Sequence, residues 1–210
     1  PSSGNLPEFS FRCTMLFKGE TRPHLIAMNG IGTAQSPRWG TRIRSTIQGS
    51  GTLPSIIASK GGSNTNNNWN EINDVGLEFE DMILEVTTNS SNSVTMCAVN
   101  GAKAKYTKFL RTNAYPHNRI GKYGTAGAIA QPTANTFGLI TSVAGDEWGS
   151  MIDQCYVAGF DYGYLGGEHC SIRDSMAWAC VTTLGLSGSS LPVFVDGLEG
   201  NGCKYQIGYV

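Results

Sequence analysis

The sequence predicts an all-β fold, a solenoid of short parallel strands stacked around one narrow core. Three observations predict it. Glycine is abundant, at 27 of 210 residues, and it weakens helices but suits the corners between short strands. Charged residues make up only 15% of the chain, against roughly 25% in an average protein. The C-terminal third contains an internal repeat whose length suits strands better than a pair of helices.

The repeat consists of three strand-like segments spaced 20 and 23 residues apart, beginning at Ile152, Ile172 and Val195. Apolar and polar residues alternate within each segment, which is typical of a strand with one buried face. Equivalent residues of a stacked solenoid lie above one another. The alignment therefore predicts four stacks: Ile152, Ile172 and Val195; Asp153, Arg173 and Asp196; Phe160, Cys180 and Cys203; and Gly163, Gly185 and Gly208.

Weaker strand patterns precede the repeat. In chain order they cover residues 9–15, 41–44, 75–79, 94–97, 102–106 and 136–140. Clusters of Gly, Asn, Ser and Pro predict loops at 61–70, 113–135 and 186–192. We expect residues 1–40 to form an N-terminal strand and capping region and residues 41–210 to form the solenoid. About 23 residues per repeat would give roughly seven to nine turns.

Composition and charge exclude several classes of function. The net charge is −1 and no basic run is present, so nucleic acid is not an expected partner. No apolar run reaches the roughly 18 residues of a membrane-spanning helix. The chain starts at Pro1 without a signal-peptide pattern, so we interpret it as a processed or excised piece.

The six cysteines are too sparse for a disulfide-rich secreted scaffold, and none forms a CxxC pair. They are expected to be reduced, buried thiols. No cofactor motif is present, and neither a cofactor nor a metal is expected.

Two segments resemble a known family. Residues 148–163, which contain Ile152, Cys155 and Phe160, resemble the repeating turn of pectate-lyase-like β-helix proteins, and residues 41–51 are similar to an early turn of that superfamily. Asparagine-rich loops, low charge and free cysteines most resemble bacteriophage tailspike or tail-fibre proteins.

The resemblance implies a right-handed, single-stranded parallel β-helix. It further implies a homotrimer in the phage tail, made in the host cytoplasm, that binds and often cleaves a bacterial surface polysaccharide. Tailspikes are usually longer, so the trimerising ends would be missing or the chain would be a smaller relative.

Carboxylates at the repeat are candidates for catalysis. Glycoside hydrolysis uses two carboxyl groups roughly 5 to 9.5 Å apart, and outward side chains at equivalent positions of neighbouring strands are about 4.8 Å apart. Candidate catalytic residues are Asp153, Arg173, Asp174, Glu168 and His169. The plainer alternatives are a solvated charge ladder for Asp153, Arg173 and Asp196, and an ordinary surface turn for Glu168 and His169.

Aromatic residues beside carboxylates suit sugar rings, which have flat apolar faces edged by hydroxyls. Candidate glycan-binding residues are Asp146, Glu147, Trp148, Tyr162 and Tyr164. The alternative for Trp148 is that it covers the end of the core. In the related lyases an Arg or Lys base works beside calcium, but no clustered aspartate loop is present, so hydrolysis is favoured over lyase chemistry.

Two other functions fit the same sequence. A free bacterial polysaccharide lyase or hydrolase would be secreted and monomeric. A structural or adhesive β-solenoid would have no sugar site.

Overall fold

The computed structural model describes residues 14–20, 41–47, 55–58, 73–88, 96–102, 104–116, 136–141, 149–167, 169–186 and 193–209. Within these ranges it contains 16 β-strands and no helix. It therefore contains, over the same residues, no helix that could cross a membrane.

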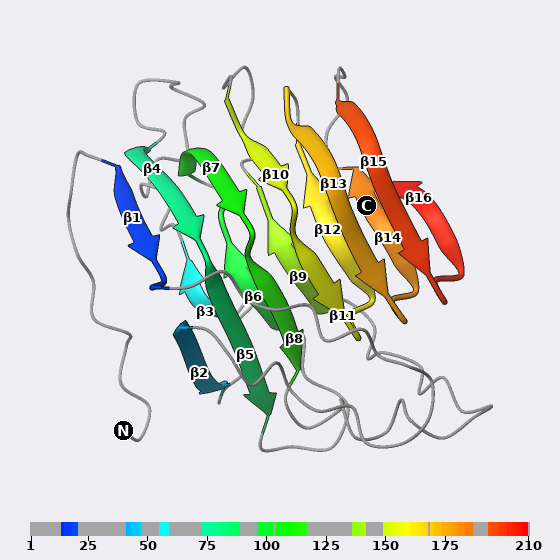
Figure 1. The fold of residues 1–210 in the computed structure, drawn as a ribbon, viewed down its shortest axis with the longest axis horizontal. Coiled ribbons are helices and arrows are strands. Elements are labelled where there is room, and N and C mark those ends of the chain that lie inside the picture. Colours follow the sequence, from blue (N-terminus) through cyan, green and yellow to red (C-terminus); the bar gives the residue numbers. More distant parts are fainter. Residues whose placement is uncertain are drawn as a thin grey trace, which may run out of the picture.

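All strand pairs are parallel, and they sort the strands into three rows (Figure 1). Row one consists of β1 (Met15–Lys18), β4 (Asn73–Glu80), β7 (Ala104–Leu110), β10 (Met151–Asp153) and the first halves of β13 (Ser171–Trp178) and β15 (Phe194–Asn201). Row two consists of β2 (Thr41–Ile47), β5 (Met82–Thr88), β8 (Asn113–Pro116), β11 (Tyr156–Ala158) and the second halves of β13 and β15. Row three consists of β3 (Ser55–Ala58), β6 (Met96–Asn100), β9 (Thr136–Ile140), β12 (Tyr162–Gly166), β14 (Thr182–Leu186) and β16 (Tyr205–Tyr209).

Rows one and two belong to one ten-stranded sheet because β13 and β15 are long enough to run through both. Residues 171–173 of β13 pair with β10, and residues 176–178 pair with β11. Row three is a separate six-stranded sheet. The prediction of an all-β chain of parallel strands is confirmed, and the pairing order is compatible with a parallel β-solenoid.

The longest row has six strands in the described part of the chain, fewer than the seven to nine turns expected. The N-terminal repeats are longer than the estimate assumed. Residues in register are 30 positions apart between Phe79 and Phe109 and 43 apart between Phe109 and Ile152, and only the last repeats have the short spacing. The added residues lie between strands and add no strand to a row.

Strand register confirms most of the sequence alignment. Ile152, Ile172 and Val195 pair in succession. The glycine stack is wrong in one member, because Leu165 and not Gly163 is opposite Gly185. The loop expected at 113–135 is wrong at its start, where Asn113–Pro116 form β8. In the expected capping region, β1 pairs with β4 and so belongs to row one, while residues 9–13 lie outside the described residues.

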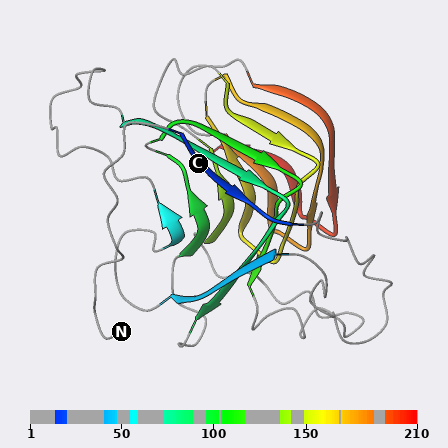
Figure 2. The same cartoon turned by 60° about the vertical axis from the view of Figure 1, so that its left-hand side comes forward.

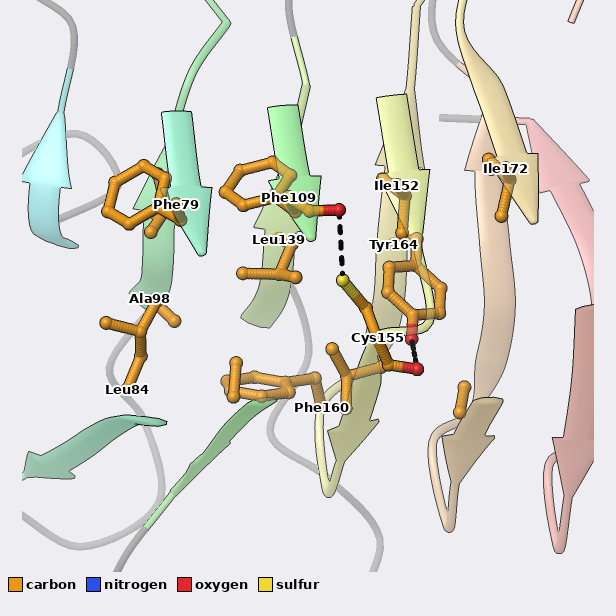
Figure 3. Close-up of a cluster of buried hydrophobic side chains, with 14 of the residues drawn as sticks. Phe79, Leu84, Ala98, Phe109, Leu139, Ile152, Cys155, Phe160, Tyr164 and Ile172 are labelled. Atoms are coloured by element: carbon orange, nitrogen blue, oxygen red, sulfur yellow. Dashed lines mark hydrogen bonds between the residues drawn. The ribbon is translucent and has the colours of Figure 1, made fainter. Parts of the chain in front are cut away.

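One main core takes apolar side chains from all three rows, which surround a common interior (Figure 2). In row one, the ring of Phe79 stacks between those of Phe17 and Phe109, with centroids 4.9 and 5.3 Å apart. Figure 3 shows the same line continuing into Ile152 and Ile172. Such ladders of like residues in register are the main packing contact between successive repeats.

The core is open at its C-terminal end. Val195 and Ile207 pair with the buried Ile172 and Leu184, yet they are 40% and 55% exposed. The strands β15 and β16 are the last of their rows in the described chain.

A sharp corner separates row one from row two in each repeat. Its residues have positive φ: Asp81, Arg111, Gln154, Asp174 and Gly197. Backbone hydrogen bonds continue the pairing through these corners, as from the amide of Gln154 to the carbonyl of Arg173 (3.1 Å). Four of these five residues are not glycine, so the surrounding pairing holds them in a conformation that side chains disfavour.

Candidate functional site

The predicted charge ladder exists in row one. Asp153 on β10 pairs with Arg173 on β13, which pairs with Asp196 on β15. Their neighbours Ile152 and Ile172 are fully buried, and side chains alternate between the two faces of a strand. The three charged side chains therefore point outward. Arg173 and Asp196 are exposed and Asp153 is half-buried.

Two further residues extend this ladder. Asp174 occupies the corner beside Arg173, with φ of 42° and an exposed side chain. Phe194, on β15, is 55% exposed, and the guanidinium of Arg173 lies 5.7 Å from its ring centroid. We name the set Asp153, Arg173, Asp174, Phe194 and Asp196 the row-one patch.

The charges of the row-one patch are not paired with one another. No ion pair in the described part of the chain joins Arg173 to Asp153, Asp174 or Asp196. Opposite charges this close usually neutralise each other when their geometry permits. The carboxylates and the guanidinium of the patch therefore keep hydrogen-bonding capacity for solvent or a ligand.

Charges nearer the N-terminus of row one behave differently. Glu80 accepts ion pairs from Lys18 (3.0 Å) and Arg111 (2.7 Å). Lys108 pairs with Glu78 at 3.1 Å. The outer surface of row one thus changes from a paired charge network to the unpaired row-one patch.

The other predicted catalytic residues are only partly described. His169 is half-buried at the corner before β13, with φ of 57°. It lies four residues before Arg173, about 13 Å along an extended chain. Glu168 lies outside the described residues, so its convergence with His169 and Arg173 stays a prediction.

The predicted glycan-binding residues do not join the row-one patch. Tyr162 lies in row three, where its ring stacks on that of Phe137 with centroids 5.2 Å apart. Asp146, Glu147 and Trp148 lie outside the described residues, and their role stays a prediction.

Tyr164 is part of the core. Its side chain is fully buried, and its hydroxyl donates hydrogen bonds to the carbonyls of Cys155 (3.0 Å) and Met176 (2.8 Å) (Figure 3). Burial raises the pKa of this hydroxyl well above its ordinary value. No face of the ring is open to a ligand on the surface, because Tyr164 is in register with the core residues Leu139 and Leu184.

Sequence analysis missed Phe194 as a member of the site. The alignment itself contained the signal, because extending it back by one position from Val195 places Phe194 beside Ser171, an outward position. An apolar aromatic residue at an outward position of a solenoid is unusual enough to notice.

A second feature that the sequence did not indicate is a buried ion pair on the outer side of row two. Glu85 is fully buried, accepts a hydrogen bond from the hydroxyl of Tyr115 (2.9 Å) and pairs with Arg42 (3.2 Å). Ile83, Tyr115 and Ala158 form a separate buried cluster there. The carboxylate of Glu85 is neutralised and enclosed, so its role is structural.

No group of three His, Cys, Asp or Glu side chains in the described ranges could hold a metal ion. In comparisons with protein families, curated proteins and solved structures, nothing matches this chain. Any function therefore has to be argued from the site alone.

Proposed function

We propose that the chain is a right-handed parallel β-helix of the phage tailspike or tail-fibre type, and that its row-one patch binds a bacterial surface polysaccharide. One observation carries the proposal: acidic and basic side chains follow one another in register along an outer face without pairing. Side chains held at a fixed spacing of about 4.8 Å form a linear array. A linear array suits a linear polymer.

The chemistry of the patch supports a sugar ligand. Sugar hydroxyls both donate and accept hydrogen bonds, so they satisfy the carboxylates of Asp153 and Asp196 and the guanidinium of Arg173 together. The exposed ring of Phe194 offers an apolar surface to the C–H face of a sugar ring. The patch has both signs of charge, which favours a neutral or mixed-charge polymer over a polyanion.

Hydrolysis is the second candidate, and the spacing of the carboxylates favours it. Asp153 and Asp196 lie two strands apart, so their backbones are separated by about 10 Å. Inverting glycosidases place their two carboxyl groups roughly 6.5 to 9.5 Å apart, with room for a water molecule. Side chains that lean together over Arg173 would bring this pair into that range.

A homotrimer belongs to the same proposal. Light scattering on the intact chain is expected to give three times the monomer mass of 22.4 kDa. A monomer that degrades polysaccharide would instead favour a free secreted enzyme.

The test is a binding screen of the intact chain against a panel of bacterial surface polysaccharides, followed by a reducing-end assay with each ligand found. We expect binding to one polysaccharide or a few related ones. If reducing ends appear, Asp153→Asn should abolish them while binding remains. A chain that binds no polysaccharide on the panel, as a trimer or as a monomer, would overturn the proposal and favour a purely structural solenoid.

A further inference from the structure

The five described cysteines are all free, and four of them are buried, as the sequence predicts. Cys203 differs from the others because it is partly exposed. Burial raises the pKa of the Cys155 and Cys170 thiols to about 12. These two thiols are therefore protonated and enclosed, and they are poor nucleophiles.

Cys180 and Cys203 lie opposite each other in neighbouring repeats. Cys180 lies between β13 and β14, and Cys203 lies between β15 and β16. Two residues before them, Trp178 pairs with Asn201, and two residues after them, Thr182 pairs with Tyr205.

Backbone hydrogen bonds fix this register on both sides of the two cysteines. The amide of Ala179 donates to the carbonyl of Asn201 (2.9 Å), and the amide of Lys204 donates to the carbonyl of Val181 (3.0 Å). Neighbouring strands are about 4.8 Å apart, which falls within the roughly 4.4 to 6.8 Å between the Cα atoms of a disulfide. The two thiols lie within hydrogen-bonding reach of each other.

We propose that Cys180 and Cys203 form a reversible disulfide through exchange with a small disulfide such as oxidised glutathione. The bond would join the last repeat to the one before it, and it is independent of polysaccharide binding.

The exchange proceeds in two balanced steps. The Cys203 thiolate attacks one sulfur of the small disulfide, which forms a mixed disulfide and releases one small thiolate. Cys180 then loses its proton to that thiolate and attacks the Cys203 sulfur, which releases the second small thiol. In sum, two protein thiols are oxidised and one small disulfide is reduced to two thiols.

The order of attack follows from the surroundings of the two sulfurs. Cys203 is accessible, and the hydrogen bond from Cys180 lowers the pKa of its thiol. Cys180 is buried, and burial raises the pKa of its thiol. Cys203 is therefore the attacking residue and Cys180 the resolving one.

The bond would hold the most exposed repeat in place. In β15 and β16, Phe194, Tyr205 and Ile207 are at least 50% exposed, so few buried contacts attach this repeat to the core. A disulfide closes the chain between residues 180 and 203 and limits its freedom when unfolded. We expect oxidation to raise the thermal midpoint by roughly 5 to 10 °C.

Peptide mapping tests the proposal on the intact chain carrying Cys13→Ser, which removes the one cysteine outside the described residues. Incubation with oxidised glutathione should lower the protein mass by about 2 Da without a lasting glutathione adduct. Trypsin and a glutamate-specific protease together release peptides 174–199 and 200–204, each with one of the two cysteines. These peptides should remain linked until a reductant is added.

The matched variants are Cys203→Ser and Cys170→Ser. Cys203→Ser should lose both the linkage and the gain in thermal midpoint, and Cys170→Ser should keep both. A persistent glutathione adduct on Cys203, a linkage between other cysteines, or no change in mass would overturn the proposal. Because these readouts need no ligand, failure here is distinguishable from failure to bind polysaccharide.

Discussion

Arg111 shows how single side chains tie neighbouring repeats together. Its Nε donates to Oδ1 of Asp81 at 2.6 Å, and its Nη2 donates to Oδ2 of Asp81 at 3.0 Å and to Glu80 at 2.7 Å. The side chain of Asp81 is only 12% exposed. A bidentate pair with little exposure is worth more than an ordinary surface pair.

We expect Arg111→Ala to lower the free energy of unfolding by about 2 to 3 kcal/mol, because it leaves the carboxylate of Asp81 enclosed without its partner. Lys108→Ala is the matched control on the same strand. Its pair with Glu78 is more exposed, so its loss should cost less than about 1 kcal/mol. Urea denaturation measures both, and equal losses would contradict the assignment.

The reactivity of Cys203 should depend on pH in an unusual range. The hydrogen bond from Cys180 lowers the pKa of its thiol to about 6, against roughly 8.5 for an ordinary cysteine. Since only the thiolate reacts, alkylation by iodoacetamide should reach half its maximal rate near pH 6. Cys180→Ala removes the donor and should move this midpoint upward. Mass spectrometry of short exposures gives the rate, and a wild-type midpoint near 8.5 would contradict the contact.

At the scale of the element, the corners between rows one and two are the recurring device. They place Asp81, Arg111, Gln154, Asp174 and Gly197 at positive φ. No single residue type occupies the position, so the sequence alignment showed no corner there. Pairing on both sides dictates the conformation, and each side chain tolerates it at a cost of about 1 kcal/mol.

Gln154 offers a direct test of corner strain. Gln154→Gly removes the steric cost of its φ of 51°, whereas the β-branched side chain of Gln154→Val increases that cost. The glycine variant should be more stable than the valine variant by about 2 kcal/mol in urea denaturation. Equal stabilities would mean that this corner is not held in the left-handed region.

Close packing between strands in row three predicts a second contrast. A Cβ added to Gly138 would collide with the backbone carbonyl of Gly163, whereas one added to Gly166 meets its nearest atom at 3.5 Å. Gly138→Ala should therefore lower the free energy of unfolding by about 1 to 3 kcal/mol. Gly166→Ala should leave it nearly unchanged. Thermal melts of the two variants compare them, and the opposite order would contradict the register of β9 and β12.

Sequence reasoning worked where repeats follow one another without insertions. The pairing of Ile152 with Ile172 and of Arg173 with Asp196 could be predicted because both repeats have nearly the same length. It failed at Gly163, because the alignment continued past the corner, where the spacing changes. Upstream, the 43 residues between Phe109 and Ile152 hid the register, although both residues occupy one inward stack.

At the scale of the whole molecule, row one divides into a paired and an unpaired half. Its N-terminal half carries the ion pairs of Lys18, Glu80 and Arg111. Its C-terminal half carries the row-one patch. The sequence contains the charges of both halves, but it could not show which of them are paired, because the partners lie in different repeats and their side-chain geometry decides.

The central claim is that the row-one patch binds a polysaccharide, and the affinity of Arg173→Ala tests it most directly. Arg173 is exposed and makes no ion pair with the carboxylates of the patch, so its removal should leave the thermal midpoint unchanged. Lys204→Ala, an exposed cation outside row one, is the control.

The measurement is the Kd of the wild type and both variants for the polysaccharide identified in the screen. We predict that Arg173→Ala weakens binding roughly tenfold or more, because charge-assisted hydrogen bonds to the ligand are lost. Lys204→Ala should bind like the wild type. An unchanged affinity of Arg173→Ala, with the wild type binding the same polysaccharide, would place the binding site elsewhere on the molecule.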